Sequence, residues 1–188
     1  MHKILKAAAL APMILASFLA GQLRATSIEK MSLEQMTSAA RVVVRVRCVA
    51  NITRWEKGEI WTLTTFRILE SWKGSAEGDI TVRLLGGRVA GLNSVVAGVP
   101  RFASGEEVVL FLESTREGDF SITAWSEGTF RIHRDEQTGI SFASQDSAGA
   151  VFNPSTRQFE PVGILRMPLE QFQERVRLAL QAQPKRRP

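Results

Sequence analysis

The chain has few of the residues that build metal sites and disulfides. Its 188 residues include one cysteine, two histidines and no tyrosine. A zinc or copper site needs several His, Cys or carboxylate ligands at workable spacing, and Cys48 and His133 alone do not provide them. A single cysteine also excludes an intramolecular disulfide, so the fold must depend on its apolar core. We expect no metal, no cofactor and a buried Cys48 thiol on an apolar strand face.

Motifs of the common enzyme classes are also absent. The sequence contains no Gly-x-Ser-x-Gly, no phosphate-binding loop and no dinucleotide-binding fingerprint. His133, in "TFRIHRDEQTG", is the one candidate base near neutral pH outside the first residues. It would need Asp135 to orient it and a serine that nothing in the sequence marks. We predict no catalytic residues, and an exported hydrolase that uses His133 is the alternative.

The first 25 residues have the pattern of a secretory signal peptide. Two lysines precede an uncharged run over residues 7–21, and Ala25 is a small residue at a plausible cleavage site. The run is too short to span a bilayer. We predict export to a bacterial periplasm or to the exterior, because an animal secretion of this size usually carries disulfides. An uncleaved anchor is the alternative, and we expect no membrane span after signal removal.

The formal net charge of +5 comes from the two ends of the chain. The basic residues at these ends are Lys3, Lys6, Arg24, Lys185, Arg186 and Arg187. Between the ends, acidic and basic residues nearly balance, which argues against a nucleic-acid partner. We expect the "PKRRP" tail to be solvated, or to touch anionic lipid or an acidic wall polymer.

Most of the remaining chain alternates between apolar and polar residues, as half-buried strands do. Strands are predicted at residues 41–50, 60–72, 79–85, 107–113, 120–126, 129–134 and 140–144. Residues 108–112 are continuously apolar, so we expect both faces of that strand to be covered. This spacing predicts a mainly β fold, either a small antiparallel Greek-key (OB-like) barrel or a sandwich.

A short helix is predicted on each side of the strands. Ser32 can cap a helix in "SLEQMTSAA". "MPLEQFQERVRLALQAQ" has Pro168 at a first helical position, and its apolar stripe comprises Leu169, Phe172, Val176 and Leu180. We expect the stripe to dock on the barrel, with a helix for a partner protein as the alternative. The predicted parts are signal peptide 1–25, helical lead 26–40, β domain 41–150, connection and helix 151–183, and tail 184–188.

The segment at residues 86–105, "GGRVAGLNSVVAGVPRFASG", is long for a connection without predicted structure. Such loops are usually functional or disordered. Its glycines let the backbone turn tightly, and its apolar side chains, Val89, Leu92, Val95, Val96, Val99 and Phe102, can pack. We predict an ordered flap, with a mobile binding loop as the alternative.

Tryptophan and arginine are the best candidates for binding. Exposed aromatic rings beside arginines can stack sugars, peptides or bases, while packing at the core or its rim is the alternative use of each tryptophan. The candidate surface comprises Arg45, Arg47, Trp61, Arg67, Arg88, Arg101, Trp125, Arg131 and His133. We predict a non-enzymatic exported binding or assembly module whose partner is a protein or glycan of the cell envelope.

The first five predicted strands, together with "ESWKG" and "RFASGEEVVLFLE", resemble the exported OB-fold domains of the netrin-module and metalloproteinase-inhibitor class. They also resemble uncharacterised bacterial exported proteins of that shape. The resemblance covers about half of the chain and implies an OB barrel, which often has a helix where this chain has residues 86–105. That class usually carries an N-terminal cysteine and disulfides, whereas this chain has Thr26 and a lone Cys48. The inhibitory mechanism of the class therefore does not carry over.

Overall fold

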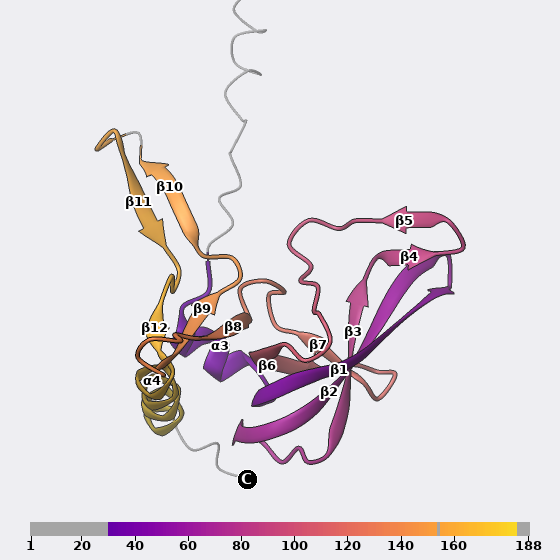
Figure 1. Cartoon of the computed structure of the whole chain (residues 1–188), viewed down its shortest axis with the longest axis horizontal. Helices are drawn as coiled ribbons and strands as arrows, with labels where there is room; N and C mark the ends of the chain where they lie inside the picture. The colour runs from indigo at the N-terminus through magenta and orange to yellow at the C-terminus, as the bar shows by residue number, and fades with distance from the viewer. Residues whose placement is uncertain (1–29, 154, 184–188) are drawn as a thin grey trace, which may run out of the picture. The chain divides into compact units, whose positions relative to one another are not determined.

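The computed structural model describes residues 30–153 and 155–183, and the elements below belong to the compact unit that begins at Met31 (Figure 1). The predicted signal peptide and basic tail lie outside the described residues. The fold is mainly β, as predicted, with a helix before the sheet, α3 (Leu33–Ala39), and one after it, α4 (Leu169–Ala182). Neither helix is long and apolar enough to cross a membrane, and this finding covers the described residues alone.

Twelve strands follow one another along the described chain. They are β1 (Val42–Glu56), β2 (Glu59–Lys73), β3 (Asp79–Leu85), β4 (Gly87–Val89), β5 (Leu92–Ser94), β6 (Glu107–Ser114), β7 (Phe120–Ile122), β8 (Thr129–Arg134), β9 (Ser141–Gln145), β10 (Gly149–Asn153), β11 (Gln158–Val162) and β12 (Met167–Pro168).

The main sheet has the strand order β1-β2-β3-β7-β6-β8-β9-β12, and β1 also pairs with β6. Strands β1, β2, β3, β7 and β6 therefore form a closed circuit of pairings. β7 runs antiparallel to β6 and parallel to β3, which it meets at Val82 and Phe120. The sheet is thus mixed: the predicted antiparallel arrangement holds for its other pairings and fails at the β3–β7 pair. Two antiparallel pairings separate β3 from β1, through β2, and two separate β7 from β1, through β6. Both strands therefore run in the direction of β1, and they are parallel where they meet.

One hydrophobic cluster fills the inner side of this circuit. Its members alternate along β1, β2, β3 and β6, and they include Val46, Cys48, Phe66, Val82 and Leu110, all buried. Cys48 is buried as predicted, and burial raises the pKa of its thiol despite a hydrogen bond from an asparagine amide.

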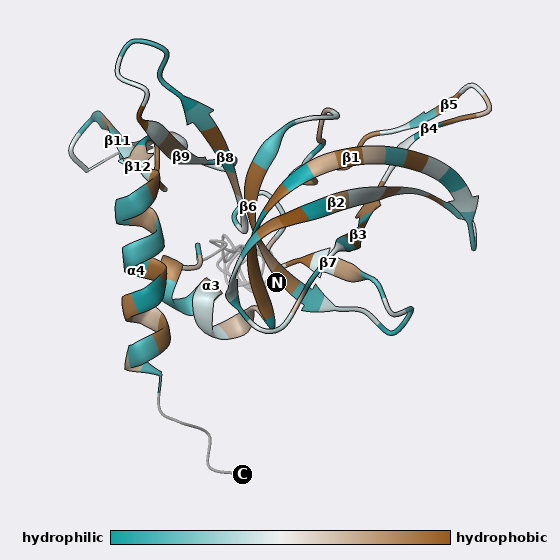
Figure 2. Ribbon diagram, turned by 60° about the horizontal axis from the view of Figure 1, so that its bottom comes forward, coloured by the Kyte–Doolittle hydropathy of each residue, from teal (hydrophilic) through white to brown (hydrophobic). Residues whose placement is uncertain are grey.

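A second cluster covers the other face of β6. Val109 and Phe111 point into it, so the strand is buried on both faces, as its continuous apolar sequence predicts. Phe172 of α4 packs its ring against Phe130 at a centroid distance of 4.6 Å and against Phe111 at 6.5 Å. Figure 2 shows the alternation of hydrophobic and hydrophilic residues along α4 that this docking requires. The predicted docking of the C-terminal helix on the chain's own β domain is confirmed.

The N-terminal helix begins as its sequence predicts. Ser32 is the residue before α3, and its hydroxyl accepts a bond from the Gln35 amide at 3.1 Å. The Gln35 side chain in turn accepts a bond from the Ser32 amide at 2.6 Å. This reciprocal capping box satisfies two backbone donors that the first turn leaves without partners.

Some predicted strand ends differ from the observed ones. The strand predicted at 41–50 continues to Glu56, because the β1–β2 hairpin extends to a two-residue turn at Lys57 and Gly58 with positive φ. The strand predicted at 120–126 ends at Ile122. Ala124 and Trp125 have positive φ values of 52° and 51°, which cannot continue a strand. The pairs β4–β5 and β10–β11, and the short β12, were not predicted.

The segment at residues 86–105 is a hairpin followed by a packed return. β4 and β5 pair around a turn at Ala90 and Gly91, both with positive φ. The return places Phe102 in the inner cluster, where its ring meets Phe66 edge-on at 5.0 Å. Asn51 Nδ2 donates to the Phe102 carbonyl at 2.9 Å. The return is packed through Phe102 and partly buried Val99, as the predicted flap requires, but Leu92 and Val95, which were expected to pack, are exposed.

Candidate binding site

Two of the arginines predicted to bind lie on the outer face of β1, paired with carboxylates. Arg45 donates to Glu70 at 2.7 Å and to Glu107 at 2.9 Å, and Arg47 donates to Glu107 at 2.5 Å. Burial alone would lower the pKa of Arg45, but its two carboxylate partners raise it overall. Burial would raise the pKa of Glu107, and the arginines lower it overall. These charges neutralise one another and are not free for a ligand.

Arg67 and Trp61 lie on the outer face of β2, and both are already engaged. Arg67 makes a bidentate contact with Asp79 at 2.9 and 3.1 Å, which raises the pKa of the guanidinium. The guanidinium of Arg83 lies 5.2 Å from the centroid of the Trp61 ring and also pairs with Asp119 at 2.9 Å. The Trp61 ring therefore has a cationic partner within the protein.

Arg101 and Arg131 hold the return of the segment at residues 86–105. Arg131 pairs with Asp146 at 2.6 Å and with Glu106, and it donates to the Arg101 carbonyl at 3.0 Å. Its guanidinium lies 5.5 Å from the centroid of the Phe102 ring. Arg101 donates to the backbone at 2.9 Å, and burial lowers its pKa. We attribute a structural role to both arginines.

His133 is exposed at the end of β8, as predicted. Asp135, which would have to orient it, accepts bonds from the amides of Gln137 and Thr138 and from Arg166 at 3.0 Å. The hydrogen bond from the Thr138 backbone amide is the main cause that lowers the pKa of Asp135. This carboxylate therefore closes a turn and anchors an arginine.

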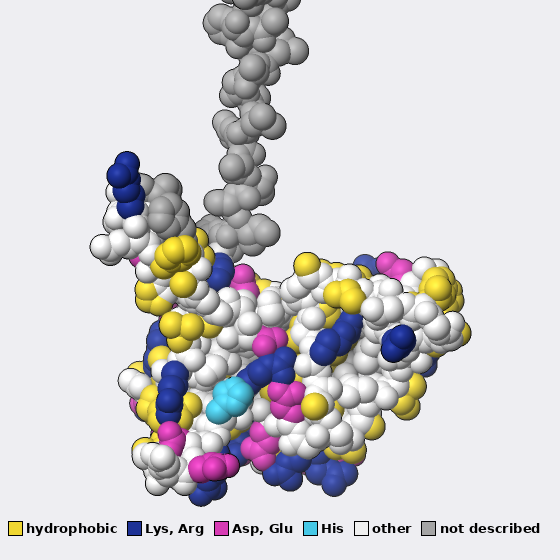
Figure 3. All heavy atoms as spheres, turned by 45° about the horizontal axis from the view of Figure 1, so that its top comes forward, with side chains coloured by type: hydrophobic (Ala, Val, Ile, Leu, Met, Phe, Trp, Pro, Cys, Tyr) yellow, Lys and Arg dark blue, Asp and Glu magenta, His cyan; other side chains and the backbone are white. Residues whose placement is uncertain are grey.

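The nine candidate residues do not form one surface. Arg47 and Arg67 are register partners across β1 and β2, and Arg101 and Arg131 are joined by a hydrogen bond. Trp125 lies in the turn after β7, beside Gly98 of the return, and exposed Arg88 lies on β4. Figure 3 shows basic and acidic side chains next to one another over much of one face. Because charges of both signs are mixed on this face, a basic patch does not mark it as a binding surface.

A cleft lies where the tip of the β1–β2 hairpin faces the β4–β5 hairpin. We call it the hairpin cleft, and its volume is about 420 Å³. Its lining comprises Trp55, Gly58, Glu59, Ile60, Leu85, Leu92, Asn93, Ser94 and Val96. Figure 1 shows β4 beside the far ends of β1 and β2, and β5 beyond it.

Two glycines allow β4 to lie against the β1–β2 hairpin. A Cβ at Gly87 would lie 2.4 Å from Thr62 Oγ1 and 2.7 Å from Thr53 Cγ2. The Gly86 amide donates to the Ile60 carbonyl at 2.6 Å, and the Thr62 hydroxyl donates to the Gly86 carbonyl at 2.7 Å. Only a residue without a side chain permits this approach, so the glycine pair fixes one wall of the cleft.

Large apolar side chains are exposed at this cleft. Trp55 and Leu92 each keep 55% of their surface exposed, and Val95, next to the lining residue Val96, keeps 82%. Single exposed apolar residues are ordinary, but a group of them beside a concave site is typical of binding surfaces. The charges near the cleft are mixed: Glu59 lines it, while Lys57 and Arg88 neighbour the lining residues Gly58 and Asn93 along the turn and across the β4–β5 pair.

Sequence reasoning did not select these residues as a site. The register of β1 against β2 shifts between Cys48 and Ala50, and Trp55 therefore lies on the face of its register partner Ile60. The alternation of the strand predicted at 41–50, continued to Gly58, would have placed the ring on the opposite face. Leu92 and Val95 were expected to pack inside a flap. The sequence feature that could have predicted the β4–β5 hairpin is the pair Ala90 and Gly91, because a glycine between two short apolar stretches favours a two-residue turn.

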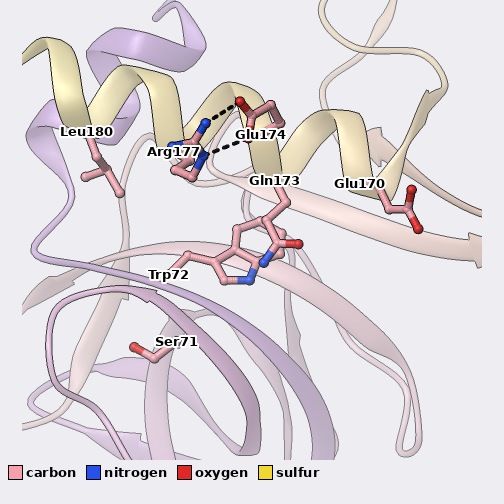
Figure 4. Close-up of a pocket in the computed structure, with 7 residues that line it drawn as sticks. All are labelled: Ser71, Trp72, Glu170, Gln173, Glu174, Arg177 and Leu180. Carbon is pink, nitrogen blue, oxygen red and sulfur yellow. Dashed lines mark hydrogen bonds and ion pairs between the residues drawn. The ribbon is translucent and has the colours of Figure 1, made fainter.

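A second hollow of about 420 Å³ lies along α4 (Figure 4). It is lined by Ser71, Trp72, Glu170, Gln173, Glu174, Arg177 and Leu180. Its polar groups are largely paired: Arg177 binds Glu174 at 2.7 and 2.6 Å, and Trp72 Nε1 donates to Glu70 at 3.0 Å. The Trp72 ring also packs on Phe172 at 6.0 Å. The hairpin cleft, with more exposed apolar surface, is the stronger candidate.

Among residues 30–153 and 155–183, no group of three or more His, Cys, Asp or Glu side chains is placed to hold a metal ion. No protein-family model matches the chain, and no curated protein sequence matches it.

Proposed function

We propose that the protein is an exported, non-enzymatic binding module that holds a partner protein of the cell envelope at the hairpin cleft. The observation that carries this proposal is the exposure of Trp55 and Leu92, which both line one cleft, with exposed Val95 next to the lining residue Val96. Transfer of apolar surface out of water stabilises a complex by about 25 cal/mol per Å². Tryptophan is also enriched among the residues that dominate binding energy.

We further propose that the closed circuit of strands is an OB-like barrel. The order β1-β2-β3-β7-β6 and back to β1, with its single parallel contact, supports this assignment. OB folds bind ligands on the face of their second and third strands and with the loops after the first and fourth strands. In this chain the loop after β1 is the turn at Lys57 and Gly58, which borders the hairpin cleft.

The proposed compartment rests on the sequence of residues 1–25, which has the basic start and short apolar run of a signal peptide. A partner in the periplasm or outside the cell follows from that compartment. A protein is favoured over a glycan because five of the nine lining residues, Trp55, Ile60, Leu85, Leu92 and Val96, are apolar and can bury apolar side chains of a partner.

The experiment is a pull-down from an envelope extract of the organism that encodes the chain. The test variant combines Trp55→Ala and Leu92→Ser, and the matched control is Leu178→Ser on α4, where the leucine is 50% exposed. We expect saturable capture of a partner by the wild type and the control, and its loss in the double variant. Circular dichroism checks that each variant is folded.

Equal capture by the double variant and the wild type would refute the cleft as the binding site. Loss of capture in Leu178→Ser alone would move the site to the exposed face of α4. Capture of a glycan in place of a protein, again lost in the double variant, would keep the cleft and overturn the proposed partner class.

A further inference from the structure

We propose that the partner contributes an extended polypeptide segment, which adds to β5 as a new strand and places its side chains in the hairpin cleft. This inference rests on the proposed function and names the form in which the partner binds. Three features carry it: the geometry of the β4–β5 hairpin, the unpaired edge of β5 and the position of the cleft beside that strand.

The hairpin geometry determines which backbone groups of β5 point outward. The turn at Ala90 and Gly91 has two residues, both with positive φ, at 48° and 80°. In such a hairpin the residues that flank the turn, here Val89 and Leu92, exchange hydrogen bonds. Bonded and non-bonded pairs alternate along an antiparallel ladder. The next pair, Arg88 and Asn93, is therefore non-bonded, and the N–H and C=O of Asn93 point away from β4.

β5 has a free edge in the described part of the chain. It belongs to a two-stranded sheet and pairs with β4 alone. Proteins usually block exposed edges with charged side chains, proline or bulges, and none of these occurs at Leu92, Asn93 or Ser94. The short length of β5 limits indiscriminate pairing, so a partner must gain additional affinity from side chains.

The cleft can supply that affinity. All three residues of β5 line it, opposite Trp55 and Ile60. In strand addition, main-chain bonds give affinity and pockets for alternate side chains give specificity. An aliphatic or aromatic side chain at every second position of the segment would meet the exposed Trp55 ring. Exposed Arg88 is in register with Asn93, so an acidic residue of the segment is favoured beside β4, away from Glu59 of the cleft lining.

The test begins with a phage-displayed library of random dodecapeptides, selected on the full chain. The strongest peptide is synthesised, and its dissociation constant is measured for the wild type, Asn93→Pro and Asn93→Ala. Proline removes the outward N–H of β5 without removing a bond of the β4–β5 ladder, and alanine keeps that N–H. We expect Asn93→Pro to weaken binding at least tenfold and Asn93→Ala to change it less than threefold.

A second measurement uses the wild-type chain, so it does not depend on how well a variant folds. The selected peptide is N-methylated at one backbone amide at a time. Strand addition predicts a loss of tenfold or more at the one peptide amide that donates to the Asn93 carbonyl, and tolerance at its two neighbours, whose N–H groups point away from β5. Equal losses at neighbouring amides, or no loss at any amide, would overturn strand addition.

The remaining outcomes separate this inference from the proposed function. If Asn93→Pro binds as the wild type does, while Trp55→Ala with Leu92→Ser loses binding, the cleft holds side chains without an added strand, and only the inference fails. If the double variant also binds normally, the proposed function fails as well. Sedimentation as a dimer that Asn93→Pro converts to a monomer would identify a second copy of the chain as the occupant of the edge, which overturns the inference.

Discussion

Replacing Phe102 with alanine tests whether the segment at residues 86–105 belongs to the core. Phe102 is 7% exposed in the inner cluster. Its ring meets Phe66 edge-on, with centroids 5.0 Å apart and an interplanar angle of 81°, and the Arg131 guanidinium lies 5.5 Å from its centroid. The ring therefore fixes the return segment to β2 and to the ion pairs of Arg131.

The expected loss follows from this burial. Truncation of a buried phenylalanine to alanine lowers the free energy of unfolding by about 3–5 kcal/mol, which includes the cavity left behind. Contact with another ring adds about 0.5–1.5 kcal/mol to what area burial alone provides, so we expect a value in the upper half of that range. Such a loss is a large fraction of the about 5–15 kcal/mol that stabilises a typical domain.

Urea denaturation, followed by tryptophan fluorescence, measures the change. With a slope of about 2 kcal/mol per M, the midpoint should fall by about 2 M. The control is Val95→Ala in the same segment, where the side chain is 82% exposed and the expected change is within about 0.5 kcal/mol. A loss below about 1 kcal/mol in Phe102→Ala would mean that the return is not packed, and the mobile-loop alternative would replace the ordered flap.

Two further predictions test the outer ion pairs and the glycine contact. Burial would raise the pKa of Glu107, but its arginine partners lower it overall. The ionised carboxylate therefore stabilises the folded protein above the ordinary carboxyl pKa of about 4.3, and this stabilisation is lost as pH falls through the lower pKa of the folded state. Glu107→Gln should lower the free energy of unfolding by about 1–2 kcal/mol at pH 7, with the difference from wild type shrinking in acid; an equal effect of Glu113→Gln, on the same strand but exposed, would contradict this. Gly87→Ala would place a Cβ 2.4 Å from a threonine hydroxyl oxygen, so we expect a loss above about 2 kcal/mol in thermal unfolding; Gly149→Ala, with no atom within 4 Å of its Cβ, should be neutral, and equal effects would refute the close approach.

The sequence predicted the elements that depend on a short stretch of consecutive residues, namely β6, α4 and the start of α3. The continuous apolar run at residues 108–112 predicted a strand covered on both faces, and β6 has that environment because it lies between two clusters. The helical stripe that contains Phe172 and Val176 predicted a docked helix for the same reason. Ser32 predicted the start of α3, since an N-cap depends on the residues of its own first turn; the capping box with Gln35 was not predicted.

Long-range pairing was not predictable in the same way. Arg45 was selected as a binding residue because its strand face is polar, but its partners Glu70 and Glu107 lie 25 and 62 residues away. Only the register of β1 against β2 and β6 brings these charges together. Trp125 was placed on a strand because "FSITAWS" alternates, whereas two consecutive residues in the left-handed region end β7 before it. The hairpin cleft itself requires the meeting of two hairpins, which no single stretch of sequence encodes.

The central claim is that the hairpin cleft binds the partner, and the most direct test is a comparison of three dissociation constants. The partner captured from the envelope extract is purified and titrated against the wild type, the Trp55→Ala and Leu92→Ser double variant, and Leu178→Ser. Loss of a dominant tryptophan contact is worth about 2 kcal/mol or more, which is about thirtyfold in the dissociation constant. We predict at least that weakening in the double variant and less than a threefold change in Leu178→Ser. Binding by the folded double variant within threefold of the wild type would contradict the account.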